Sequence, residues 1–150
     1  MKRMFSAIAA VAMLAAAPAI ADEVWSAGEG FEIVYESEVG DYAVLSYPGE
    51  YEDDPRELAF IEDLAGNYDD RGRHDGYWVA EAVPQGEGGC DVSIIDHTGV
   101  ETNVWGRVEL IFLETSYPTG FVAQRGWCFE EPRDEIVARP LTAADYANEE

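Results

Sequence analysis

Residues 31–47 read FEIVYESEVGDYAVLSY, and this stretch decides the fold class. Phe31, Ile33 and Tyr35 lie on one side of the run and Glu32 and Glu36 on the other, which is the two-residue period of a strand with one buried face. Residues 38–41 carry turn-forming side chains, and the apolar run that follows returns as a second strand. The stretch therefore predicts an antiparallel β-hairpin.

The same reading extends along most of the chain. Turn signals recur at Tyr47-Pro48-Gly49, Asp96–Gly99 and Tyr117–Gly120, separated by short apolar runs. Further strands are expected at 76–83, 90–95, 100–105, 107–114, 121–130 and 136–139. Closely spaced strands joined by turns, without a βαβ rhythm, predict a mainly β protein, a small antiparallel barrel or sandwich in one domain.

One segment, at about 55–65, favours a helix instead. Asp54 can cap it, Pro55 suits its first position, and Glu57 can complete a capping box. From Leu58 onward, apolar residues recur at i, i+3, i+6 and i+7, and a glycine follows. This pattern predicts one amphipathic helix packed on the sheet.

The first 21 residues have the form of a secretory signal peptide. Lys2 and Arg3 precede an apolar stretch, and an A-x-A cleavage site ends at Ala21. Cleavage there leaves a single exported domain, residues 22–150, in the periplasm or the medium. No later stretch approaches the roughly 20 apolar residues of a membrane span, so none is expected.

The predicted mature chain is strongly acidic. Without Lys2 and Arg3, seven basic residues, all arginine, remain against 31 acidic residues, a formal net charge of −24. Such a surface repels phosphate backbones, which excludes nucleic acid as a partner and favours a cationic protein or metal ions. The alternative is that the acidity reflects a saline habitat, with arginine preferred in a GC-rich genome.

The two cysteines, Cys90 and Cys128, are expected to form one disulfide after export. Closing this loop stabilises the fold by about 4 kcal/mol on the loop-entropy model. A zinc site that recruits His74 and His97 is the alternative, but the spacings match no zinc motif. No metal or other cofactor is expected.

Residues 90–99, CDVSIIDHTG, contain Ser93, Asp96 and His97, the chemical parts of a hydrolase triad. The context is unsuitable because Ser93 lies within a predicted strand and no nucleophile elbow surrounds it. Asp96 to Gly99 has the pattern of a type I turn followed by a glycine bulge. The sequence therefore predicts an exposed turn, on which nothing orients His97, and no catalytic residue.

Residues 67–78, NYDDRGRHDGYW, combine charged and aromatic side chains. The acids do not follow the spacing of a calcium-binding loop. The segment is either a solvated loop with internal Arg–Asp pairs or a recognition loop. In the second case Arg73, His74, Tyr77 and Trp78 are the candidate binding residues, because loops on a rigid scaffold often carry function.

The four tryptophans are expected mainly in the core, with Trp127 covering the disulfide beside it. The function that the sequence favours is a non-catalytic, strongly acidic exported binding domain with a cationic protein as partner. Two alternatives remain open, namely a small hydrolase of envelope polymers and an aromatic-lined pocket for a sugar or lipid fragment.

Overall fold

The computed structural model describes residues 23–28, 30–47, 56–67, 69 and 71–147. The predicted signal peptide, residues 1–21, lies outside the described residues, as do Asp54 and Pro55 of the predicted helix start.

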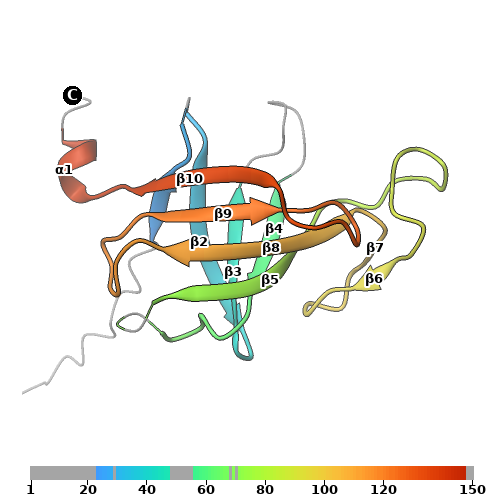
Figure 1. Cartoon of the computed structure of the whole chain (residues 1–150), viewed down its shortest axis with the longest axis horizontal. Helices are drawn as coiled ribbons and strands as arrows, with labels where there is room; N and C mark the ends of the chain where they lie inside the picture. The colour runs from blue at the N-terminus through green and yellow to red at the C-terminus, as the bar shows by residue number, and fades with distance from the viewer. Residues whose placement is uncertain (1–22, 29, 48–55, 68, 70, 148–150) are drawn as a thin grey trace, which may run out of the picture.

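Eight antiparallel strands close into a barrel, which confirms the mainly β prediction and selects the barrel over the sandwich. Each barrel strand pairs with the next barrel strand along the chain, and the last pairs with the first (Figure 1). The strands are β1 (Val24–Ser26), β2 (Glu32–Val39), β3 (Tyr42–Tyr47), β4 (Glu57–Ile61), β5 (Arg73–Val79), β8 (Trp105–Phe112), β9 (Phe121–Arg125) and β10 (Asp134–Pro140). Between β5 and β8 the chain inserts a hairpin of β6 (Ile94–Ile95) and β7 (Glu101–Thr102).

A four-residue helix, α1 (Ala143–Tyr146), follows the barrel. In Figure 1 it lies at the end of β10, away from the β6–β7 hairpin. Within the described part of the chain, no helix has the length and apolar character that crossing a membrane requires.

The opening hairpin forms as predicted. Strands β2 and β3 pair through Tyr35 and Leu45, with a bulge before Ser37. Gly40 adopts a φ of 61° in the connecting turn, a conformation that glycine tolerates without strain. Alternation then directs Ile33, Tyr35 and Leu45 into the barrel, where each is buried.

The predicted helix at about 55–65 is wrong, because residues 57–61 form strand β4. Alternate residues of β4, Ala59 and Ile61, are buried in the barrel core, whereas Phe60 is buried against its outer face. A strand buried on both faces has a continuous apolar run rather than a clean alternation. Within such a run some apolar residues also fall at the spacing of a helical stripe. Leu64, buried in the following turn, fits the same spacing.

The predicted disulfide between Cys90 and Cys128 is present, with the two Cα atoms 5.7 Å apart. It joins the segment that follows β5 to the turn that follows β9. Cys90 belongs to a second apolar cluster outside the barrel, which contains Val44, Phe60, Val79 and Trp105. The buried tryptophan of this cluster is Trp105, whereas Trp127 packs beside Trp78; that Trp127 also covers the disulfide stays a prediction.

The barrel is closed at the end where β8 turns into β9. There Arg71 donates two hydrogen bonds of 2.6 Å to the carboxylate of Glu23. Both side chains are buried, at 1% and 8% exposure. The guanidinium lies over the rings of Phe112 and Tyr117, so the ion pair and the aromatic rings together plug this end.

Candidate binding pocket

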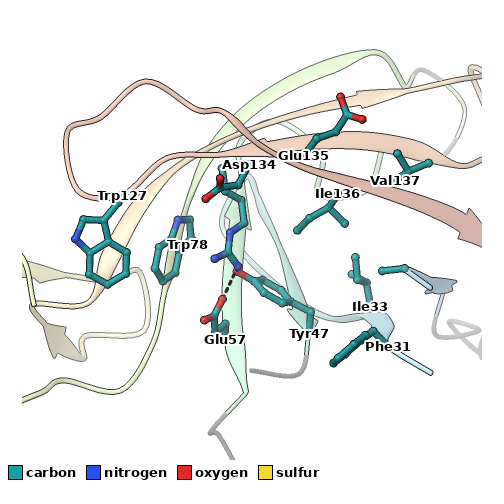
Figure 2. A pocket seen from close by; sticks show the side chains of 12 residues that line it. Phe31, Ile33, Tyr47, Glu57, Trp78, Trp127, Asp134, Glu135, Ile136 and Val137 are labelled. Carbon is teal, nitrogen blue, oxygen red and sulfur yellow. Dashed lines mark hydrogen bonds and ion pairs between the residues drawn. The ribbon is translucent and has the colours of Figure 1, made fainter. Parts of the chain in front are cut away.

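A cavity of about 610 Å³ opens at the opposite end of the barrel. It lies where β3, β5 and β9 end and β4 and β10 begin. Twelve residues line it, four aromatic, four aliphatic and four charged (Figure 2). They are Phe31, Tyr47, Trp78 and Trp127, then Ala27, Ile33, Ile136 and Val137, and finally Glu57, Arg125, Asp134 and Glu135.

Arg125 forms the floor of this pocket. Its guanidinium lies 4.5 Å from the ring centre of Trp78 and 5.0 Å from that of Tyr47, both within cation–π range. It donates one hydrogen bond of 2.6 Å to Glu57 and another to the hydroxyl of Tyr47. Burial raises the pKa of Tyr47 well above its usual value, so its hydroxyl stays neutral.

Below this floor the barrel is packed. The remaining space there is about 20 Å³, enclosed mainly by apolar side chains such as Leu45, Leu110 and Phe121. That volume is near the minimum that one water molecule needs. Within the described part of the barrel interior, room for an organic ligand therefore lies above Arg125, in the mouth of the barrel, and not below it.

Trp78 and Trp127 form one wall of the pocket, with ring centres 5.4 Å apart. The indole N–H of Trp78 donates to the carbonyl of Gly126 at 2.8 Å, which fixes the ring. Gly106, opposite Trp78 on β8, makes room for this contact. A Cβ atom at position 106 would collide with the carbonyl oxygen of Gly126 and lie 2.5 Å from the indole nitrogen.

The rim of the pocket exposes apolar surface. Phe31 and Trp127 are each 40% exposed, and Val137 is 58% exposed. In Figure 2 the two tryptophans stand on one side of the pocket, and Phe31 and Ile33 stand on the other. Exposed apolar side chains gathered around a concavity are typical of a ligand-binding site.

The pocket carries an excess of negative charge. Glu57 and Arg125 compensate each other, at a distance of 2.6 Å. Asp134 and Glu135 form no ion pair with any described residue. Asp134 lies near the floor, whereas Glu135 points away from it (Figure 2).

The four residues predicted to bind do not share one surface. Because β5 alternates, Arg73 and Tyr77 lie outside the barrel, whereas His74 and Trp78 are buried inside. Trp78 is the one of the four that lines the mouth pocket. A binding role for the other three stays a prediction, and the structure gives them separate surroundings.

The contacts that Arg73 and His74 make there are of the kind that stabilise the fold. Arg73 pairs with Glu109 at 2.8 Å on the outer surface, in the manner expected of a solvated segment. His74 donates from Nδ1 to the carbonyl of Glu62 at 3.0 Å. Its Nε2 is buried, with no hydrogen-bond partner among the described residues.

The turn at Asp96 forms as predicted, but His97 is more ordered than expected. The amide of Gly99 donates to the carbonyl of Asp96 at 3.0 Å, and Gly99 adopts a φ of 88°. The His97 imidazole packs against the ring of Tyr42 with ring centres 3.9 Å apart and a tilt of 35° between the rings. Its Nδ1 lies 2.5 Å from the hydroxyl of Tyr77, so this contact orients it on the barrel.

The triad alternative receives no support from this geometry. Asp96 accepts hydrogen bonds from Thr98 and Val100 within its own turn. Burial raises the pKa of Asp96, but these hydrogen bonds outweigh it and lower the pKa overall. Among the described residues no hydrogen bond joins Ser93 to His97. The hydrogen bonds of Asp96 hold its turn together.

Sequence reasoning missed most of the pocket. Tyr47, Glu57, Arg125 and Asp134 all continue the inward-facing alternation of their strands to the barrel end. For Arg125 a signal existed, since it is in phase with the buried Phe121 and Ala123. A charged residue at an inward position of a barrel strand indicates either a buried ion pair or a polar cavity.

Among residues 23–28, 30–47, 56–67, 69 and 71–147, no group of three or more His, Cys, Asp or Glu side chains is arranged to hold a metal ion. Comparisons of the chain with protein-family models, with curated proteins and with solved structures found no match.

Proposed function

We propose that this chain is an exported binding protein that holds a small, partly apolar organic molecule in the mouth of its barrel. The observation that carries the proposal is the 610 Å³ pocket above Arg125, with Trp78 and Trp127 as its wall. The pocket volume lies within the range of about 300–1,000 Å³ that is typical of small-molecule sites. The mouth of a closed β-barrel is also a common position for such sites.

The pocket is rigid enough to recognise a ligand without large rearrangement. Tyr47, Glu57, Trp78 and Arg125 belong to strands, and hydrogen bonds hold all four side chains. A preformed site loses little conformational entropy on binding, so more of the contact energy remains for affinity. Rings that are already fixed also provide a defined surface for stacking.

The pocket chemistry favours binding over hydrolysis. The twelve described residues that line it include no serine, threonine, cysteine or histidine. A serine, threonine or cysteine nucleophile paired with a histidine base, the usual arrangement in acyl-transfer hydrolases, therefore has no members there. The floor carboxylate, Glu57, is engaged with Arg125.

Dye binding tests this proposal. The mature protein should bind the neutral apolar dye N-phenyl-1-naphthylamine, with a rise in dye fluorescence that saturates. Trp127→Ala removes one ring of the wall and should weaken binding about tenfold, a loss of about 1.4 kcal/mol. The matched control is Phe129→Ala, because Phe129 is also exposed, at 71%, but packs on Trp105 outside the pocket.

The control should leave the dye affinity within about twofold of the wild-type value, a change below about 0.5 kcal/mol. No saturable dye binding would contradict the proposed function. Equal losses in Trp127→Ala and Phe129→Ala would show that the dye binds elsewhere on the surface.

A specific observation also supports a cationic protein partner as a second function. Six of the seven arginines among the described residues already pair with carboxylates of the same chain. Most of the 31 acidic residues therefore have no internal counter-charge. The resulting field would steer a basic protein toward the surface, and the affinity would fall as salt rises. Calorimetric titration with cytochrome c at low and high salt tests this, and equal affinities would contradict it.

A further inference from the structure

We infer that the mouth pocket selects a cationic amphiphile, a protonated amine attached to an apolar ring or short chain. This inference rests on the proposed binding function and specifies the class of ligand. It follows from three features of the pocket: its uncompensated carboxylates, its aromatic wall and its separate apolar wall.

The charges of the pocket favour a cation. Three carboxylates and one guanidinium line it, and the guanidinium of Arg125 is matched by Glu57 at 2.6 Å. Asp134 and Glu135 have no ion-pair partner among the described residues. An ammonium group entering the mouth would provide the counter-charge that these carboxylates lack.

Glu57 contributes a third carboxylate to the pocket. Its Oε2 accepts the hydrogen bond from Arg125, and the Tyr47 hydroxyl is a further hydrogen-bond partner of this carboxylate. The Glu57 side chain is 15% exposed, so this carboxylate faces the pocket in partly desolvated surroundings. A charge-assisted hydrogen bond is stronger there than on an open surface.

The aromatic wall provides the second attraction. The faces of Trp78 and Tyr47 already hold one cation, the guanidinium of Arg125, at 4.5 and 5.0 Å. Trp127 stands next to Trp78 and is 40% exposed, so part of its indole remains accessible. Tryptophan is the side chain whose ring attracts cations best, so an ammonium group near Trp127 gains a further contact.

The apolar part of the ligand has its own surface. Phe31, Ile33, Ile136 and Val137 line the pocket away from the two tryptophans (Figure 2). A ring or short chain placed against them removes apolar surface from water on both partners. The two surfaces together fit a molecule with one charged end and one apolar end.

An anionic ligand fits poorly. It would have to share the guanidinium of Arg125 with Glu57, which is already bonded to it. It would also place a second negative charge beside Glu57 and Asp134, and like charges at close range repel. The pocket therefore discriminates by charge as well as by shape.

Three molecules with the same phenylbutyl body test the inference, namely 4-phenylbutylamine, 4-phenylbutan-1-ol and 5-phenylpentanoate. They carry the same apolar body with a cationic, neutral or anionic head at neutral pH. Calorimetric titration of the mature protein at low salt should give the tightest binding for the amine, about tenfold tighter than the alcohol. The carboxylate should bind more weakly than the alcohol.

The titrations distinguish failure of the ligand class from failure of the proposed binding function. If the alcohol or the carboxylate binds as tightly as the amine, the cationic preference is wrong but small-molecule binding stands. If none of the three binds, both the ligand class and the proposed function are wrong.

Variants locate the preference in the pocket. Asp134→Asn should weaken the amine about fivefold and leave the alcohol unchanged, because only the charge is removed. Glu131→Gln is the matched control, since Glu131 is exposed outside the pocket and pairs weakly with Arg107 at 3.7 Å. Glu135→Gln repeats the test at the rim if Asp134→Asn does not fold. Unchanged amine affinity in the pocket variants, or an equal loss in Glu131→Gln, would overturn the assignment.

Discussion

Replacing Arg71 by methionine is expected to destabilise the barrel more than any substitution of an exposed arginine. Arg71 and Glu23 are joined by two hydrogen bonds of 2.6 Å, and their side chains are only 1% and 8% exposed. Removing Arg71 leaves the buried Glu23 carboxylate without its counter-charge. Burial of an unpaired charge is among the most unfavourable changes available to a folded protein.

The size of the effect follows from this burial. Breaking a buried ion pair by removing one partner costs about 3–5 kcal/mol, against a total stability of about 5–15 kcal/mol for a domain. At about 3 °C per kcal/mol for a chain of this length, the midpoint of thermal unfolding should fall by about 12 °C. Circular dichroism and tryptophan fluorescence should report the same transition if unfolding is two-state.

The matched control is Arg73→Met, the same substitution two residues along the chain. The Arg73 side chain is 60% exposed, and its pair with Glu109 lies outside the barrel, so the expected loss is below about 1 kcal/mol. A double variant, Glu23→Leu with Arg71→Met, should recover most of the stability because no charge remains buried. Equal losses for Arg71→Met and Arg73→Met would refute the reasoning, since burial would then not determine the cost.

Three further outcomes are expected. Gly106→Ala should lower the free energy of unfolding by about 1–3 kcal/mol and alter tryptophan fluorescence, because the new methyl group collides with the backbone carbonyl of Gly126. Gly72→Ala is the control and should be nearly neutral in the same unfolding assay, because the space around its Cβ is open. Replacing Cys90 and Cys128 by serine should remove about 4 kcal/mol in denaturant unfolding and weaken dye binding, because the bridge holds the turn that bears the pocket wall. Burial raises the pKa of Tyr77 to about 12, so its contribution to stability should be complete below pH 10 and lost as the pH rises toward 12. Burial also raises the pKa values of Tyr42, Tyr47 and Tyr117, so in an ultraviolet titration Tyr77→Phe should remove the share of one tyrosine from the late absorbance change and leave the rest.

Much of the fold was predictable because period-two alternation is a local property of the chain. Strand β3, Tyr42–Tyr47, coincides with the predicted run, and the turn at Gly99 formed with its expected glycine bulge. The disulfide followed from the cysteine count and the predicted export. The failure at β4 has a non-local cause, because its outer face is buried by Val44 and Trp105, which arrive from other parts of the chain.

The candidate site was less predictable, because it depends on where strands end relative to one another. Tyr47, Glu57 and Arg125 come from three strands, and only closure of the barrel brings them together. The candidate binding residues within 73–78 are close in sequence, but the strand does not place them on one surface. Consecutive residues of a strand face alternate sides, so neighbours in sequence such as Tyr77 and Trp78 are separated by the sheet.

The two ends of the barrel use the same chemistry with different results. At each end an arginine pairs with a glutamate and is covered by two aromatic rings, Arg71 with Glu23 and Arg125 with Glu57. Arginine suits both positions because its planar guanidinium stacks on rings and binds carboxylates through its edge. Arg71 is 1% exposed and closes its end, whereas Arg125 is 21% exposed and supports an open pocket. The function is therefore to be sought at the Arg125 end, where the ion pair seals the core below and leaves aromatic and carboxylate groups facing the solvent above.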